Sequence, residues 1–158
     1  MEGKPVRESY SHLSELALPN DSNGLSTLLG GKIMHLVDIA GAIAAARHAR
    51  RICVTASFDH MDFLEPVFIG NLVTLRTAVN RAFCTSMEVG VKVFAEDLHA
   101  GEVRHVASAY LTFVAIDDQR RPIPVPPAIP ESDDEKRRYE QASERRSYRL
   151  SLRTRRGS

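Results

Sequence analysis

The sequence predicts an α+β domain in which one antiparallel sheet packs against a single long helix. A long apolar, Ala-rich run predicts the helix, and several β-branched runs with period-two alternation predict the strands. No helical pattern separates the strand runs, which favours antiparallel pairing. The chain has 158 residues, of which 43% are hydrophobic, so it can form one domain with a substantial core.

The first part of the chain leads into the helix. Residues 8–18 fit either a first strand or a short helical turn, and residues 19–24 (PNDSNG) are dense in turn formers and predict a loop. Residues 32–51 form the apolar run, and the basic residues at its end suit the negative end of a helix dipole. Because apolar residues occupy nearly every side of this helix, we expect it to be buried.

Four strand-like runs follow the helix and are separated by turn signals at Gly70-Asn71 and at residues 99–101. They lie at residues 52–58, 72–82, 86–93 and 103–116. Five prolines between Arg121 and Pro130 predict an extended strap, since proline lacks the amide that a sheet requires. We therefore divide the chain into a domain at residues 1–130 and a charged, Arg-rich tail at 131–158, with a surface helix over 133–150.

The near-zero net charge of +1 hides an asymmetry between the body and the tail. Residues 136–158 hold nine of the 21 basic residues and two of the 20 acidic ones, so the tail carries +7 and the rest of the chain −6. Such a tail suits a polyanionic ligand or the acidic surface of another subunit. Its few aromatic residues disfavour single-stranded nucleic acid, and a solvated helix is the default interpretation.

The composition excludes several classes of protein. No run of about 18 uncharged apolar residues is present, which predicts no membrane span, and the N-terminus lacks a secretory pattern. Cys53 and Cys84 form no C-x-x-C pair, and we expect both to be buried on strands of a cytoplasmic protein with reduced thiols. His35, His48 and His60 lack the spacing of metal ligands, so we expect no metal site.

Asp38 is the strongest candidate for chemistry, because it lies inside an otherwise apolar helix. A buried carboxylate without a partner costs several kcal/mol, so its presence calls for a reason. It could act as a general base or nucleophile, or it could form a salt bridge to another subunit.

Gly30 and Gly31 lie just before the apolar run, where the backbone amides of a helix N-terminus could stabilise an oxyanion. A tight turn is the simpler explanation for these glycines. Asn23 could hold a carbonyl group or a water molecule. Thr85 and Ser86 could contact a phosphate or a pantetheine chain, although hydroxyls are common where strands begin.

Five blocks of the sequence, in order, carry a resemblance to a known family. The first is Asn23-(x)3-Thr27-Leu28-Leu29-Gly30-Gly31-Lys32-(x)5-Asp38, and the others lie at residues 54–57 with 62–67, 85–89, 112–117 and 125–126. Together they resemble the acyl-CoA hydrolases of the hotdog superfamily, over about residues 10–150. In such proteins glycine is common at the position of Ser26, and phenylalanine at the position of Leu29.

The resemblance implies a hotdog fold, with the sheet curled around the central helix. It also implies a homo-oligomer whose functional unit is a dimer, commonly assembled as a trimer of dimers. The implied active site lies at the dimer interface, where Asn23 of one subunit faces Asp38 of the other. The implied reaction is hydrolysis of acyl-CoA to a fatty acid and coenzyme A, with no cofactor beyond the coenzyme A of the substrate.

The same resemblance implies roles for individual residues. Asp38 activates water or attacks the thioester, the amide of Gly31 beside Gly30 polarises the carbonyl group, and Asn23 positions the water or the carbonyl. Arg81 or the tail supplies cations for the phosphates of coenzyme A, beside Thr85 and Ser86. The main alternative is a non-catalytic acyl-CoA sensor. A nucleic-acid-binding arm and a dehydratase that uses His35 are weaker alternatives.

Overall fold

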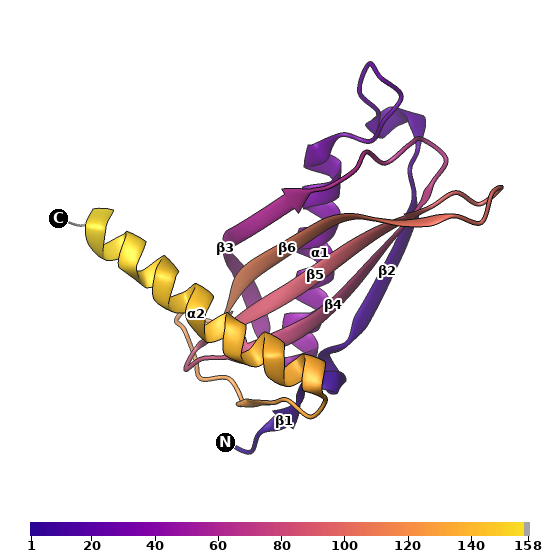
Figure 1. The fold of residues 1–158 in the computed structure, drawn as a ribbon. Helices are drawn as coiled ribbons and strands as arrows, with labels where there is room; N and C mark the ends of the chain where they lie inside the picture. Colours follow the sequence, from indigo (N-terminus) through magenta and orange to yellow (C-terminus); the bar gives the residue numbers. More distant parts are fainter. Residues whose placement is uncertain (157–158) are drawn as a thin grey trace.

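The computed structural model describes residues 1–156, and it confirms the α+β class and the antiparallel sheet that wraps around a long helix (Figure 1). The sheet has five strands in the order β2-β4-β5-β6-β3, and every neighbouring pair is antiparallel. The strands are β2 (Ser11–Leu16), β3 (Ile52–Phe63), β4 (Leu72–Ala82), β5 (Ser86–Glu96) and β6 (Val103–Ile116). The helices are α1 (Gly30–Ala49) and α2 (Asp133–Arg156), with short 3-10 turns at Val6–Ser9 and Pro19–Asp21.

The core lies between α1 and one face of the sheet. Alternate residues of β5 from Met87 to Ala95 are buried and point toward the helix, as period-two patterning requires. Gly41 lets α1 approach β6 closely, because a Cβ atom at this position would lie 2.9 Å from the ring of Phe113. This close packing fixes the height of α1 above the sheet.

The expectation that α1 is buried on all sides is wrong for the single chain. Ile33, Leu36 and Val37 are buried, but Met34 and Ile39 are exposed on the side of the helix that faces away from the sheet. One five-stranded sheet covers only one side of a helix. An apolar strip of α1 is therefore left open beside Asp38.

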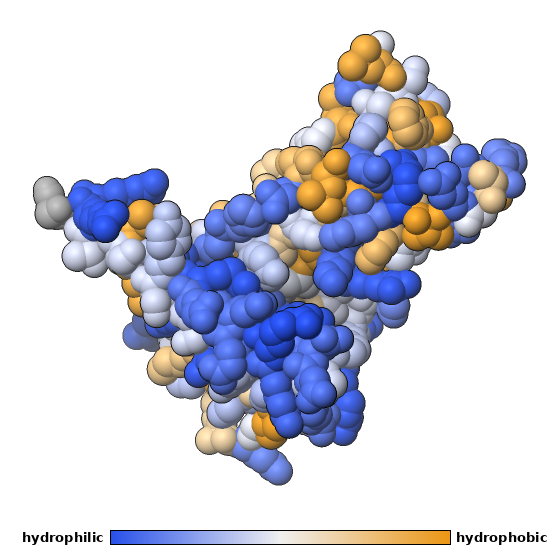
Figure 2. Space-filling model, viewed as in Figure 1, coloured by the Kyte–Doolittle hydropathy of each residue, from blue (hydrophilic) through white to orange (hydrophobic). Residues whose placement is uncertain are grey.

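The proline-rich segment runs back along the domain as an extended strap. Its strand β7 (Ala128–Ile129) pairs in parallel with β1 (Lys4–Pro5), and Val125 donates a backbone hydrogen bond to Cys84. The chain then enters α2, which crosses the outer face of the sheet and extends beyond β3 (Figure 1). The surface over α2 is strongly hydrophilic (Figure 2). None of the helices within residues 1–156 combines the length and hydropathy needed to cross a membrane.

The expected burial of both cysteines is wrong for Cys84. Strand β4 ends at Ala82, so Cys84 lies in the turn before β5 and is exposed. Cys53 lies on β3, where burial raises the pKa of its thiol to about 11. Both thiols are free.

Ser26 occupies a backbone conformation that favours glycine. Its φ is +60°, and its exposed side chain lies in the loop between Asn23 and α1. A residue with a Cβ atom pays about 1 kcal/mol there. We expect Ser26→Gly to raise the free energy of unfolding by up to about 1 kcal/mol in urea denaturation, whereas Ser26→Ala should not. A Gly variant less stable than wild type would contradict this account of the loop.

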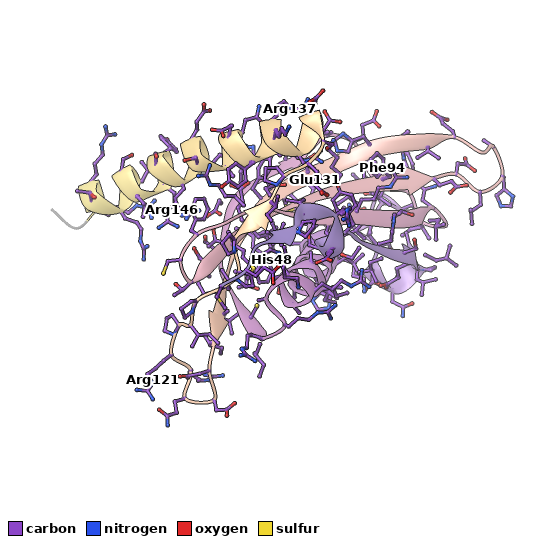
Figure 3. The ribbon with its side chains drawn as sticks, turned by 90° about the horizontal axis from the view of Figure 1, so that it is seen from below. His48, Phe94, Arg121, Glu131, Arg137 and Arg146 are labelled. Carbon is purple, nitrogen blue, oxygen red and sulfur yellow. The ribbon has the colours of Figure 1, made fainter. Side chains whose placement is uncertain are left out.

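Because of His48, we expect the free energy of unfolding to decrease in mild acid. The side chain is fully buried, and its Nε2 lies 2.7 Å from the carbonyl oxygen of Pro126 (Figure 3). Burial lowers the pKa of His48 from its ordinary value of 6.5. As the pH falls below 6.5, the His48 side chain is protonated in the unfolded chain but stays neutral in the folded chain. The free energy of unfolding therefore falls as the pH decreases. Urea denaturation between pH 7.5 and 5 should show a shallower fall for His48→Gln, and equal slopes would contradict the prediction.

Candidate active site

Asp38 and Thr55 form the centre of the candidate site. Asp38 lies two turns into α1 and is half-buried, and the hydroxyl of Thr55 on β3 donates a 2.5 Å hydrogen bond to its Oδ1. Thr55 is opposite Phe113 of β6, whose ring packs on α1. This register places Thr55 on the helix side of the sheet. One carboxylate oxygen is thus held in position while the other is left for a ligand or a water molecule.

Thr55 is a site residue that was not predicted from the sequence. It lies in one of the resembling blocks, but nothing in that block separates its hydroxyl from those of ordinary strand residues. The strand alternates between two faces, and β3 contains register shifts after Thr55 and after Phe58. Because a bulge changes which face each later residue takes, the sequence pattern could not place these side chains.

The first turn of α1 supplies backbone amides. The residue before the helix, Leu29, offers no side-chain cap, and the first amides of a helix have no acceptor within it. Gly31 is exposed, and no atom lies within 4 Å of where its Cβ would be. Gly30 lies near the ring of Phe63. The end of the helix is therefore open to a ligand oxygen.

Asn23 organises the loop in front of this helix end. Its Oδ1 accepts hydrogen bonds from the amides of Leu25 and Thr27, and its Nδ2 donates to the Thr27 hydroxyl at 2.7 Å. Lys32 ties the same region together through ion pairs with Glu15 and Asp21. The side chain of Asn23 is half-buried, so part of it faces solvent.

Asp38 and the amide of Gly31 are separated along the helix. Seven residues at 1.5 Å per residue place them about 10 Å apart along the axis of α1. A thioester carbonyl is far smaller than this distance. Along one helix, the Asp38 carboxylate and the Gly31 amide are therefore not side by side.

Arg81, Thr85 and Ser86 lie away from Asp38, near α2. The guanidinium of Arg81 stacks 3.9 Å from the ring centre of Tyr139 and donates to the Tyr139 carbonyl. Ser86 accepts a hydrogen bond from Arg146 of α2, while the carbonyl of Thr85 accepts the amide of Ala115. The structure thus groups these residues with the C-terminal helix.

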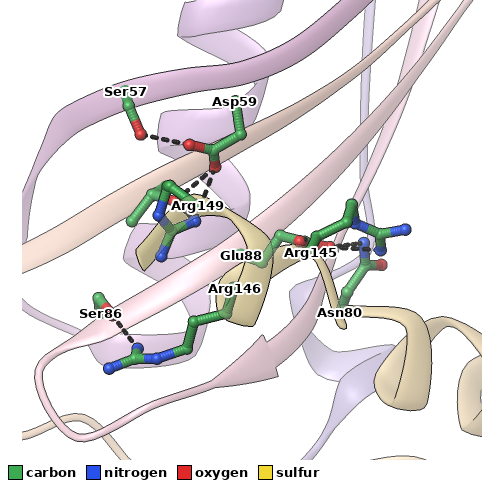
Figure 4. A network of polar contacts seen from close by, with 9 residues as sticks. Ser57, Asp59, Asn80, Ser86, Glu88, Arg145, Arg146 and Arg149 are labelled. Carbon is green, nitrogen blue, oxygen red and sulfur yellow. Dashed lines mark hydrogen bonds and ion pairs between the residues drawn. The ribbon is translucent and has the colours of Figure 1, made fainter. Parts of the chain in front are cut away.

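The contacts that hold α2 on the sheet were not predicted from the sequence (Figure 4). Arg145 makes two hydrogen bonds to Glu88, at 2.7 and 2.9 Å, and Arg149 contacts Asp59 at 3.1 Å. Glu88 is almost fully buried. A separate point concerns metal ions. Within residues 1–156, no group of three or more His, Cys, Asp or Glu side chains lies close enough together to hold a metal ion.

The chain is similar in sequence to a known family and to individual proteins within it. Residues 25–102 match the Thioesterase superfamily. The chain is 43% identical over 129 residues to YkhA of Bacillus subtilis, named an uncharacterized acyl-CoA thioester hydrolase, covering 82% of this chain and 75% of that one.

Two solved structures are similar over nearly the whole chain. An acyl-CoA hydrolase of Staphylococcus aureus, solved with butyryl coenzyme A and coenzyme A, is 37% identical with a TM-score of 0.90, covering 96% of this chain and 93% of that one. A hexameric acyl-CoA thioesterase, solved in the apo form, is also 37% identical with a TM-score of 0.93, and the match covers 96% and 97% of the two chains.

Proposed function

The chain belongs to the Thioesterase superfamily and is an acyl-CoA thioester hydrolase with the hotdog fold, and we propose that two subunits share each active site. In this proposal Asp38 comes from one subunit, while Asn23 and Gly31 come from the other. The observation that carries it is that Asp38 and Gly31 lie seven residues apart on the same helix, about 10 Å along its axis. In the proposed dimer, a second copy of α1 brings an Asp38 carboxylate to the thioester carbonyl that the Gly31 amide holds.

Asp38 supplies the carboxylate for the reaction. As a general base it takes a proton from water while the water oxygen attacks the thioester carbon. As a nucleophile it attacks the same carbon and forms an anhydride, which water then opens. On either route the C–S bond breaks, and the thiolate of coenzyme A leaves and takes up a proton. The Thr55 hydroxyl positions Asp38 by donating to Oδ1.

The amide of Gly31 binds the carbonyl oxygen as negative charge develops on it. The helix N-terminus is positive, and the space in front of Gly31 is open. Asn23 orients the water or the carbonyl from the preceding loop. These groups require only acyl-CoA and water, so we propose that the enzyme needs no further cofactor. The two free thiols fit a reducing compartment such as the cytoplasm.

The fold supports assembly through β3. This strand is at the edge of the sheet, is 12 residues long, and exposes Ile52, Val54 and Phe63. A long apolar edge strand carries unpaired backbone N–H and C=O groups, which favour pairing with a strand of another chain. We propose that two chains join at β3, so that the exposed strip of α1 at Met34 and Ile39 is covered in the dimer. Because a hexameric relative is known, we further propose a trimer of dimers.

Release of free thiol from a series of acyl-CoAs, from short to long chains, tests the proposed function. We expect turnover, with a chain-length profile that identifies the preferred substrates. A protein that binds acyl-CoA but releases no thiol would instead be a sensor module. The presence of Asp38 and Asn23 together with an open helix N-terminus favours the hydrolase over the sensor, because binding alone requires no carboxylate.

A further inference from the structure

Met34 lies on α1 between the helix N-terminus and Asp38, on the side of the helix that faces β3. Residues four apart in a helix share one face, so Gly30, Met34 and Asp38 form a row along α1. A Cβ atom at Gly30 would lie 3.6 Å from the ring of Phe63, and Asp38 accepts the hydrogen bond from Thr55. Both ends of the row thus lie beside β3. Met34 therefore faces the middle of this strand, and its side chain is 40% exposed.

The middle of β3 is apolar on the side that faces the helix. Phe58 pairs with Leu111 and Met61 pairs with Ala109, and both of these β6 residues are buried beneath α1. Paired residues of neighbouring strands lie on the same face of a sheet. Phe58 and Met61 are partly buried and pack against the core from this face. Together with Met34 they form an apolar surface between the two ends of the row.

The loop in front of the helix N-terminus offers polar groups instead. Lys32 forms ion pairs with Glu15 and Asp21, and Asn23 uses both atoms of its amide for hydrogen bonds. An acyl chain is apolar, whereas the pantetheine arm of coenzyme A carries amides that need hydrogen-bond partners. We therefore expect the acyl chain to run from the Gly31 amide inward along the apolar surface, and the pantetheine to leave past the loop.

The symmetry of the proposed dimer brings Met34 close to its two-fold axis. When Gly31 of each subunit faces Asp38 of the other, the two copies of α1 run antiparallel. The midpoint between positions 31 and 38 then lies at the axis, between residues 34 and 35. Met34 and the partner's Met34 meet there, about 5 Å along the helix from each site. A space of this length holds roughly four methylene groups.

We propose that Met34 and the partner's Met34 close the inner end of both acyl sites and limit the length of the acyl chain. This inference rests on the hydrolase function and the shared active site proposed above. A short acyl chain fits between the thioester carbonyl and the methionine pair, and a longer chain meets their side chains. Because methionine is flexible, longer chains are disfavoured rather than excluded. Met34 is thus a specificity-determining residue.

Thiol release from acyl-CoAs of different length tests the role of Met34. We expect Met34→Ala to raise kcat/KM for octanoyl-CoA relative to butyryl-CoA by about tenfold, because the shorter side chain opens the space between the two sites. Met34→Trp should lower kcat/KM for butyryl-CoA relative to acetyl-CoA by about tenfold. Leu98→Ala is the matched control, because it shortens an apolar side chain that is 52% exposed in the turn between β5 and β6. Its ratios should equal those of wild type.

Cross-linking tests the position of Met34 at the axis. The test uses a background without the natural thiols, Cys53→Ser/Cys84→Ser. In it, Met34→Cys should be joined to its copy by a short bis-maleimide and run as a dimer on a denaturing gel. Leu98→Cys in the same background should run as a monomer, because the turn between β5 and β6 projects away from the β3 edge (Figure 1).

Two results would overturn the proposal. One is a folded Met34→Ala enzyme whose ratio for octanoyl-CoA and butyryl-CoA equals that of wild type. The other is a Met34→Cys protein that is dimeric in solution but does not cross-link. If wild type releases no thiol from any of these substrates, the proposed function is contradicted instead. The calorimetric affinities for the same two acyl-CoAs then replace the rates, and Met34→Ala should shift their ratio in the same direction.

Discussion

Asp38→Asn is expected to lower kcat for acyl-CoA hydrolysis by about 100-fold or more, because it removes the group that activates water or attacks the thioester. The amide oxygen of asparagine can still accept the hydrogen bond from Thr55, so the fold should persist. Thiol release measures the rate, and circular dichroism and size-exclusion chromatography check the folded oligomer.

Asp118→Asn is the matched control for this substitution. It makes the same chemical change in the exposed turn after β6, and its rate should equal that of wild type. A folded Asp38→Asn enzyme with more than about a tenth of wild-type kcat would contradict the role given to Asp38.

Arg145→Met is expected to have the largest effect on stability. It leaves the carboxylate of Glu88, whose side chain is 2% exposed, without its charged partner. Asn80 still donates one hydrogen bond, but an amide does not replace a guanidinium that binds both carboxylate oxygens. Breaking such a buried pair costs roughly 3 kcal/mol or more. Urea denaturation at a fixed protomer concentration measures the loss.

Two further variants identify the cause of that loss. Adding Glu88→Gln to Arg145→Met removes the unpaired charge, so the double variant should be more stable than Arg145→Met alone. Arg137→Met removes an exposed ion pair from the same helix and should change stability by less than about 0.5 kcal/mol. A double variant that is no more stable than the single one would show that the charge of Glu88 is not the cause.

The fold was largely predictable because its signals are local. The period-two runs at 72–82 and 103–116 coincide with β4 and β6, and the apolar run gives α1 to within two residues at each end. The exposed strip of α1 was not predictable. An apolar pattern indicates that a surface is buried, but it does not tell whether the same chain or another subunit buries it. In one chain the sheet covers one side only, and Met34 and Ile39 remain exposed.

The contacts under α2 were not predictable for a different reason. Glu88 alternates with buried residues of β5, so the pattern places it on the face that would normally meet solvent. Its burial depends on Arg145, 57 residues further along the chain, and on the path of the proline-rich strap. The site residues Asp38, Asn23 and Gly31 were proposed from chemistry and resemblance. Their meeting across two subunits depends on an assembly that a single chain does not contain.

Subunit mixing tests the shared active site most directly. Asp38→Asn and Asn23→Ala are each expected to be inactive as pure oligomers. If the site is shared, a mixed dimer contains one site with both substitutions and one intact site. Dissociating and reassembling the two variants at equal amounts should then restore about a quarter of wild-type thiol release. A mixture that reassembles and stays as inactive as its parents would place Asp38 and Asn23 of one chain in the same site and contradict the account.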